Sequence, residues 1–150
     1  MIIRKLQSGE PPPVELLLLA DESPALVEEY IQRGQCFVAE ADGVIIGEYV
    51  LLPTRPATVE LVNIAVSPGW QGKGIGKQLV HHAVRHAREL GYQTIEIGTG
   101  NSGFGQLALY QKCGFRMVGI DRDFYVRHYA QEIYENGIQL RDMVRLSQDL

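Results

Sequence analysis

The hydrophobic pattern of the first half of the chain predicts a series of strands. Ile2–Leu6, Cys36–Glu40 and Val44–Leu52 are rich in β-branched and other apolar residues, and turn-forming or polar residues bound them. Asp42-Gly43, between the last two segments, is typical of a tight hairpin turn. Another such strand begins near Thr58 and ends where a serine, a proline and a glycine follow in a row. We expect these strands to pair antiparallel.

Helical spacing and helix boundaries predict four further segments. Val14–Ala20 follows three consecutive prolines. The next helix starts at Ser23, which is a suitable N-cap before a proline, and ends at Gly34. Ile75–Leu90 repeats apolar residues at helical spacing over its whole length, and Gln106–Cys113 is a shorter helix ended by a glycine.

Strands return in the second half of the chain. Gln93–Ile97 follows the long helix, and a strand, a helix and a strand in succession imply a parallel pair with a right-handed crossover. Phe115–Ile120 and Ile138–Leu146 are predicted as two closing strands, with Asn136-Gly137 as the turn before the last. The order of elements predicts an α/β fold, an α+β arrangement with one mixed sheet.

Length and composition narrow the class of protein. The 150 residues most simply form one domain, residues 1–150, and 45% apolar with 21% charged residues is ordinary for a globular protein. The net charge of −4 argues against binding to nucleic acid or to an anionic membrane, because both need a basic field. The same mild acidity is compatible with a cationic amine as a partner.

The cysteines and the apolar runs indicate the cellular compartment of the protein. Cys36 and Cys113 lie far apart within apolar segments, so we expect buried free thiols rather than a disulfide. The longest apolar run, Val14–Ala20, is interrupted by Glu15 and is too short to cross a bilayer. The start of the chain lacks the pattern of a signal peptide. We therefore expect a cytoplasmic protein.

The segment with the most specific chemistry is Gln71–Gly76, between a predicted strand and the long helix. Its three glycines stand at alternate positions, and backbone without side chains can approach a ligand closely. Free N–H groups at a helix start attract anions, and Lys73 and Lys77 add positive charge there. We therefore predict a phosphate site, preferably for a diphosphate.

Spacing distinguishes among the known phosphate-binding loops. A Walker A loop fails because Gln71 stands where its first glycine belongs and Gln78 follows the glycine–lysine pair. A dinucleotide fingerprint also fails in this loop, but Gly98–Gly103 matches one after a strand, with Asp121 or Asp123 at the distance of a ribose-binding acid. An NAD site is therefore an alternative, although few strand–helix units remain after it. The pattern that the first loop does fit is [RQ]-x-x-G-x-[GA].

This loop resembles the acetyl-CoA pyrophosphate loop of the GNAT N-acetyltransferase superfamily. Asn101 followed by Ala108–Phe115 is similar to a second family pattern, N-x(n)-[AL]-x-x-x-Y-x-[KR]-x-G-F. The chain is most similar to small stand-alone bacterial members, and Tyr134–Gln139 resembles a Bacillus-type subgroup. The resemblance implies the GNAT acyl-CoA N-acyltransferase fold, with a central mixed sheet of about seven strands flanked by about four helices.

The resemblance also implies an activity, the transfer of acetyl from acetyl-CoA to a primary amine within a ternary complex. An amine with a pKa of about 10.4 needs about 5 kcal/mol to free its lone pair at pH 7, so a base matters. Glu60 stands where the family has a strand glutamate before the loop and is the candidate base. Tyr110 is the candidate acid for the leaving thiolate. The alternatives are a solvated carboxylate and a core tyrosine.

The same resemblance implies acetyl-CoA as co-substrate and no metal. Backbone groups of the strand before the loop should bind the pantetheine amides and the thioester, and the loop should hold the diphosphate. Asn101 should contact the pantetheine arm. The predicted cofactor-binding residues are Ile64, Ala65, Val66, Gln71, Gly72, Lys73, Gly74, Ile75, Gly76, Lys77 and Asn101.

The sequence leaves open the roles of two polar groups and the identity of the acceptor. His82 and His86 have a zinc-like spacing, but no third ligand lies near them in sequence, and a solvated helix edge is the simpler interpretation. The aromatic and acidic tract Asp121–Tyr129 could shape an acceptor pocket, cap the core or form a homodimer surface. The acceptor is expected to be a small amine, a peptide N-terminus or a lysine. A non-catalytic acyl-CoA-binding module on the same fold is the alternative function.

Overall fold

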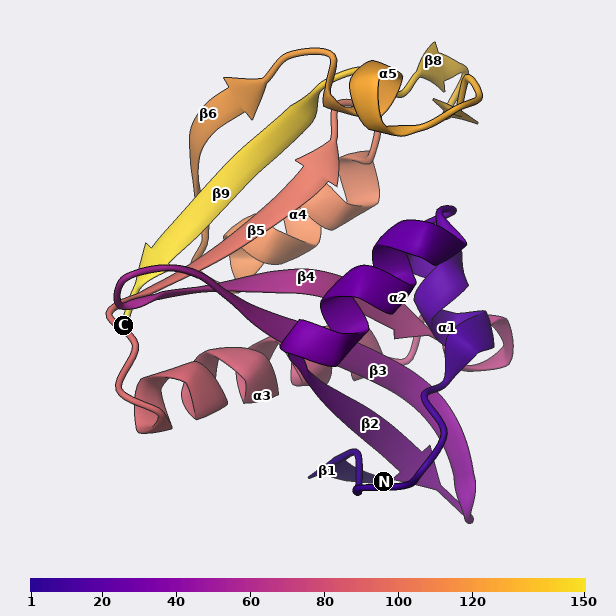
Figure 1. Cartoon of the computed structure of the whole chain (residues 1–150), viewed down its shortest axis with the longest axis vertical. Helices are drawn as coiled ribbons and strands as arrows, with labels where there is room; N and C mark the ends of the chain where they lie inside the picture. Colours follow the sequence, from indigo (N-terminus) through magenta and orange to yellow (C-terminus); the bar gives the residue numbers. More distant parts are fainter.

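A computed structural model describes all 150 residues, and its centre is a seven-stranded mixed sheet (Figure 1). The strand order is β1-β2-β3-β4-β5-β9-β6, and β7 and β8 form a separate ribbon. All neighbours in the large sheet pair antiparallel except β4 and β5, which confirms the predicted mixed sheet. The strands are β1 (Ile2–Lys5), β2 (Gln35–Ala41), β3 (Val44–Arg55), β4 (Thr58–Val66), β5 (Thr94–Gly100), β6 (Arg116–Asp121), β7 (Tyr134–Glu135), β8 (Ile138–Gln139) and β9 (Met143–Asp149).

Helices cover both faces of this sheet (Figure 1). The first two helices lie on one face, where α1 packs mainly on β4, and α3 lies on the opposite face against β3 and β4. None of the helices combines the length and the apolar content that crossing a membrane requires. The helices are α1 (Val14–Ala20), α2 (Pro24–Arg33), α3 (Ile75–Glu89), α4 (Phe104–Lys112) and α5 (Phe124–His128), with a 3₁₀ turn η1 (Pro68–Trp70).

Local sequence explains where several elements begin and end. The Ser23 hydroxyl accepts a hydrogen bond from the Leu26 N–H at 3.3 Å and so caps α2. Asp42 and Gly43 both have positive φ, as the two central residues of a type I′ hairpin turn require. Gly114, with a φ of 98°, directly follows the C-cap of α4 and ends the helix. These features agree with the predicted helix start, hairpin and helix end.

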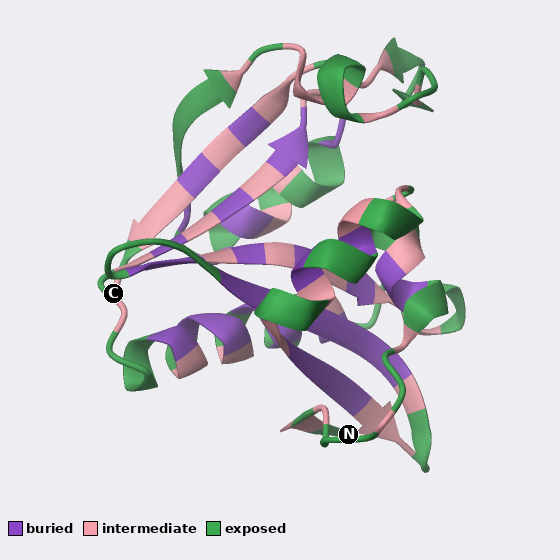
Figure 2. Ribbon diagram, in the orientation of Figure 1, coloured by how far each residue is buried: buried purple, intermediate pink, exposed green.

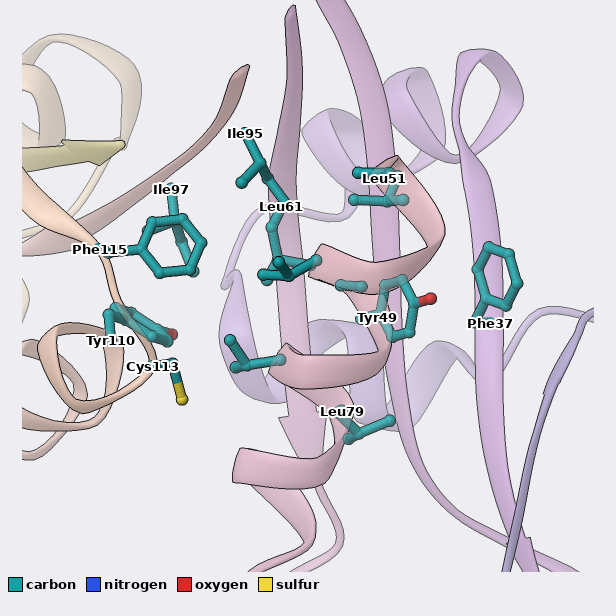
Figure 3. Close-up of a cluster of buried hydrophobic side chains, with 14 of the residues drawn as sticks. Phe37, Tyr49, Leu51, Leu61, Leu79, Ile95, Ile97, Tyr110, Cys113 and Phe115 are labelled. Carbon is teal, nitrogen blue, oxygen red and sulfur yellow. The ribbon is translucent and has the colours of Figure 1, made fainter. Parts of the chain in front are cut away.

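The core has two parts because the sheet is covered on both faces (Figure 2). Twenty buried residues form the larger part, to which the sheet, α3 and α4 contribute, and seven form the smaller part beneath α1 and α2. Leu61 of β4 and Leu79 of α3 belong to the larger part (Figure 3). Tyr110 and Phe115 pack edge to face there, with ring centroids 6.3 Å apart. Burial of α4 against the same core as α3 fixes its position beside β5.

The parallel pair β4–β5 is short, which opens the middle of the sheet. Thr58–Leu61 pairs with Thr94–Ile97, and the pairing does not continue beyond these residues. Val50 lies opposite Asn63 but the next residue of β3 lies opposite Leu61, so Val62 is the extra residue of a β-bulge. A bulge bends its strand and re-aims the residues after it. The end of β4 therefore leaves β5.

The C-terminal part corrects the predicted single strand Ile138–Leu146. The structure has a short hairpin of β7 and β8 across Asn136-Gly137, and β9 begins only after a bend. In this bend the Asn101 side-chain oxygen accepts hydrogen bonds from the backbone N–H groups of Arg141 at 2.8 Å and Asp142 at 3.0 Å. The local pattern could not show this bend because a side chain from a distant loop holds it. The short helix α5 was not predicted either.

The prediction that His82 and His86 lie on a solvated edge of α3 is also wrong. His82 Nδ1 lies 2.7 Å from the Tyr49 hydroxyl in a hydrogen bond, and the His86 ring lies 4.6 Å from the Phe37 ring. Both histidines are half-buried, and loss of water contact lowers the pKa of His82. No group of three or more His, Cys, Asp or Glu side chains is placed to hold a metal ion. Both cysteines are buried free thiols, as predicted.

Candidate functional site

The bend in β4 opens a cleft between β4 and β5 with a volume of about 490 Å³. Ile64, Ala65 and Val66 line one side of this cleft, and Ile97–Gly100 lines the other. The two strand ends do not pair with each other, so their facing backbone groups have no partner in the sheet. Buried backbone N–H and C=O groups need hydrogen bonds. An extended ligand that carries amide groups can supply them.

The glycine loop lies at one end of the cleft. Gly72 and Gly74 have φ values of 77° and 81°, and a Cβ on either would meet no atom within 4 Å. The backbone conformation requires these glycines, and the space beside them is open to a ligand. Gly76 lines the cleft, as does Gln71, whose side-chain amide donates to the Val66 carbonyl at 3.0 Å. The loop is thereby tied to the end of β4.

The start of α3 can hold an anion. Gly74 is the N-cap and has no side chain to accept a hydrogen bond from the first-turn N–H groups. Those N–H groups and the helix dipole therefore stay available to a negatively charged group. Lys77 is exposed in the first turn, and Lys73 Nζ lies 5.2 Å from the centre of the Trp70 ring. These contacts gather positive charge where the sequence predicts a diphosphate site.

The second glycine motif, Gly98–Gly103, is built for a different purpose. Gly98 and Gly100 lie within β5, where a Cβ would overlap Met143 Sδ and Leu140 Cδ1 respectively. Side chains from the end of the chain therefore fill the space into which a Cβ would project at these two glycines. These glycines serve packing, so the structure does not support the NAD alternative.

Tyr110 faces the cleft from α4, where the sequence predicts the acid. Its side chain is 5% exposed, lines the cleft and packs against Phe115. Burial raises the pKa of the Tyr110 phenol above its ordinary value, so the hydroxyl stays protonated at neutral pH. A protonated phenol in the cleft wall can donate a hydrogen bond or a proton to a ligand.

Glu60 lies one residue before the point where β4 and β5 separate. It is half-buried and in register with Glu96 of β5, but it is not one of the residues that line the cleft. Loss of water contact raises the pKa of Glu60, while the positive charge of Arg145 lowers it and the Glu96 carboxylate raises it. The carboxyl thus lies next to the cleft rather than in its wall.

Asn101 anchors the bend before β9. Its Nδ2 donates to the Gln139 carbonyl at 3.1 Å, and its oxygen accepts the two backbone hydrogen bonds described above. Both ends of this amide are therefore used within the protein, and Asn101 is not part of the cleft wall. Its predicted contact with a pantetheine arm stays a prediction.

A second cavity of about 180 Å³, which we call the side cavity, adjoins the cleft. It lies between the end of α1, the helix α5 and the β7–β8 hairpin. Tyr125 and Tyr129 of the tract Asp121–Tyr129 line it, so this tract borders a pocket, and its part in acceptor binding stays a prediction. The residues that line both cavities are Leu19, Ala20, Tyr125, Glu135 and Leu140.

Asp21 connects the walls of the side cavity. Its carboxylate accepts hydrogen bonds from the Tyr30 hydroxyl at 3.0 Å, the Tyr129 hydroxyl at 2.7 Å and the Ser23 N–H at 3.1 Å. One carboxylate therefore joins the α1–α2 turn to the end of α5. Asp21 was not predicted as a site residue, because an acid beside a serine cap looks like part of a helix start. No local pattern points to its partner 108 residues away.

Two polar side chains are buried under α1 and α2. Asn63 is 3% exposed and lines the cleft, and its Nδ2 donates to the Leu17 carbonyl at 2.9 Å and the Tyr30 hydroxyl at 2.8 Å. Its Oδ1 has no hydrogen-bond partner. Neither carboxyl oxygen of the fully buried Glu48 has a partner, and burial raises the pKa of Glu48 well above its ordinary value. Burial thus favours the neutral form of the Glu48 carboxyl.

Comparisons with known proteins agree with this geometry. A model of the acetyltransferase (GNAT) family matches residues 3–115, which include the glycine loop and α4. The N-acetyltransferase YvbK of Bacillus subtilis is 61% identical over 136 residues, which cover 91% of this chain and 88% of YvbK. The similarity to small bacterial members of the family therefore extends over most of the chain.

Two solved structures share the fold over nearly the whole length. The IAA acetyltransferase from Bacillus cereus is 52% identical with a TM-score of 0.95, and the match covers 99% of both chains. A GNAT family acetyltransferase from Elizabethkingia anophelis with acetyl-CoA bound is 43% identical with a TM-score of 0.98, and the match covers 99% of this chain and 97% of the other.

Proposed function

This chain belongs to the acetyltransferase (GNAT) family, and from this premise we propose that it transfers acetyl from acetyl-CoA to a primary amine within a ternary complex. The observation that carries the proposal is the cleft between β4 and β5. It brings together an anion site at the start of α3, an unpaired strand edge and a buried phenol. These three features match the diphosphate, the pantetheine amides and the thioester of acetyl-CoA.

The donor is held mostly by backbone. The N–H groups of the loop from Gln71 to Lys77 bind the diphosphate, and the free edge of Ile64–Val66 binds the pantetheine amides as an added strand would. Lys73 and Lys77 add positive charge near the diphosphate. The acetyl-CoA in the Elizabethkingia anophelis structure supports acetyl-CoA as the donor.

The acceptor amine must lose a proton before its nitrogen attacks the thioester carbon. Glu60 accepts this proton through a water molecule, because the carboxyl is next to the cleft but not in its wall. The raised pKa of Glu60 makes its carboxylate a better proton acceptor than an exposed one. Direct transfer of acetyl to the amine then needs no acyl-enzyme.

The leaving sulfur gains negative charge as the bond between the acetyl carbon and the sulfur breaks. Tyr110 donates a hydrogen bond or a proton to that sulfur from the wall of the cleft. Because burial raises the pKa of this phenol, the proton is present at the start of each cycle. A thiol rather than a thiolate then leaves.

The experiment that tests the proposal is a panel of acceptors with acetyl-CoA. Free thiol and acetylated product are measured for alkylamines, diamines, peptide N-termini, lysine side chains and IAA. We expect thiol release and one acetyl group gained by mass with at least one primary amine. A protein that binds CoA in calorimetry but acetylates no member of the panel would instead be a non-catalytic acyl-CoA-binding module.

A further inference from the structure

The side cavity adjoins the cleft where an acceptor would enter. Both cavities share the lining residues Tyr125, Glu135 and Leu140. A small acceptor whose reactive amine lies in the cleft therefore has room for a second group in the side cavity. The volume of about 180 Å³ suits a short chain with a polar head rather than a folded partner.

The ionisable groups around the side cavity are predominantly acidic. Asp21, Glu22 and Glu135 line it, and no lysine, arginine or histidine does. Glu22 and Glu135 are exposed side chains without an ion pair, so their charges are not neutralised within the protein. Asp21 accepts only neutral donors, two hydroxyls and one N–H. The cavity therefore attracts a cation and repels an anion.

Aromatic rings add to this preference. Tyr125 and Tyr129 lie with ring centroids 5.6 Å apart, and both line the side cavity with Tyr134. An ammonium group near the face of an aromatic ring is attracted by the ring electrons. Tyrosine rings and carboxylates together favour an alkylammonium group over a bare metal ion.

A separate observation lies in the cleft itself. Asn63 lines the cleft and is only 3% exposed, and its Oδ1 has no hydrogen-bond partner. Its Nδ2 is held by Leu17 and Tyr30, which fixes the orientation of the amide. Because Oδ1 is itself shielded from solvent, Asn63 supports the wall of the cleft rather than contacting an acceptor.

We infer that the acceptor is a small amine with a second cationic group, which the side cavity binds while the reactive amine lies in the cleft. This inference rests on the proposed function and names its acceptor class, a diamine of short alkyl length. Glu22 and Glu135 determine the preference for the second charge.

The first test measures binding without catalysis. The protein loaded with CoA is titrated calorimetrically with diamines of three to six methylene groups, with pentylamine and with 5-aminopentanoate. We expect at least one diamine to bind about tenfold more tightly than pentylamine, and 5-aminopentanoate to bind most weakly. Equal affinity of all the diamines and pentylamine would overturn the inference without bearing on acetyl transfer.

The second test measures the charge preference in variants. Glu22→Gln and Glu135→Gln should each reduce the ratio of diamine to pentylamine affinity by about two- to fivefold, as expected for exposed charges, and the double variant should reduce it further. Glu28→Gln removes the same charge from an exposed position on α2 that lines neither cavity, and should leave the ratio unchanged. An unchanged ratio in the double variant would overturn the assignment of the side cavity.

The third test separates this inference from the proposed function. Acetyl-CoA turnover is measured with the best diamine and with pentylamine. Acetylation of pentylamine with the same kcat/KM as every diamine would leave the acetyltransferase proposal intact and refute the second cationic site. Tight diamine binding with no acetylation of any amine would support the cation site and refute the proposed function.

Discussion

The two ends of the cleft differ in whether backbone or side chains form them. The donor end consists mostly of backbone, namely the loop with Gly72 and Gly74 at positive φ, the uncapped start of α3 and the unpaired edge of β4. The proposed acceptor end consists of side chains such as Asp21, Tyr125 and Glu135, which come from segments far apart in the chain. A site formed by backbone changes little with single substitutions, whereas a site formed by side chains can change its ligand through them.

The two glycine motifs show the same contrast at smaller scale. A Cβ on Gly72 or Gly74 would meet nothing, whereas a Cβ on Gly98 or Gly100 would meet the side chains of Met143 and Leu140. Identical residue types therefore serve ligand approach in one motif and packing in the other. Spacing alone could not separate these roles, because the packing partners lie some forty residues later in the chain.

The largest expected effect is at the donor end. Gly76→Glu should lower CoA affinity at least about 100-fold in calorimetry, because a carboxylate at the start of α3 repels the diphosphate and fills the cleft. The fold should persist, since a Cβ at Gly76 meets only Leu109 at 3.7 Å and Val66 at 4.0 Å. Gly119→Glu places the same residue in open space at the edge strand β6 and is the matched control.

The donor site would have to lie elsewhere if Gly76→Glu bound CoA as tightly as Gly119→Glu does. Unfolding of Gly76→Glu is checked by its melting temperature. The variant Gly76→Ala covers that case, because a single methyl group makes ordinary contacts at this position. It should retain CoA binding more fully than Gly76→Glu.

The second-largest effect is expected at Tyr110, in the wall of the cleft. Tyr110→Phe should lower kcat by about 100-fold or more, the usual contribution of a general acid, while CoA affinity changes little. The ring still packs against Phe115, so the change removes a hydroxyl and little else. A loss of less than about tenfold in kcat would show that Tyr110 contributes mainly packing.

Much of the fold and of the donor end follows from the sequence, and the physical reason is locality. Periodicity, the Ser23 cap and the Asp42-Gly43 turn depend on neighbouring residues, and so does the glycine loop. The bend before β9 does not, because Asn101 holds it from another loop. The side cavity depends on Asp21 contacting Tyr129, which no local pattern encodes.

A smaller effect is expected from the candidate base. Glu60→Gln should lower kcat/KM by about tenfold at pH 7 and recover relative to wild type as pH rises, because the acceptor amine then loses its proton without a base. The raised pKa of Glu60 means that wild-type activity should rise with pH through that pKa. Kinetics from pH 4 to 9 test both expectations.

The control for this variant is Glu28→Gln, which removes a carboxyl from an exposed position on α2 that lines neither cavity. Its kcat/KM should stay within about twofold of wild type at every pH. Glu60 would play no part in proton removal if Glu60→Gln and wild type had the same kcat/KM at every pH from 6 to 9.

The smallest effect on activity is expected at Glu48, which lies on the acceptor side of the sheet but touches neither cavity. Its pKa is raised in the fold, so the folded state holds a proton that the unfolded state releases above the ordinary carboxyl pKa. The contribution of Glu48 to the stability of the wild type should therefore be greatest below that ordinary pKa. This contribution should fall by up to about 1.4 kcal/mol per pH unit as pH rises toward the folded-state pKa.

Glu48→Gln keeps the shape of the side chain and has no proton to release, so its stability should lack this slope. The variant should gain stability relative to wild type as pH rises from 5 to 8, measured as the free energy of unfolding in urea at each pH. Glu28→Gln, at an exposed position on α2, should keep the wild-type slope. Parallel curves for Glu48→Gln and wild type would mean that Glu48 is not a buried neutral carboxyl. If Glu48→Gln changes the pH dependence of stability but not kcat/KM, then Glu48 affects folding stability and not the two cavities.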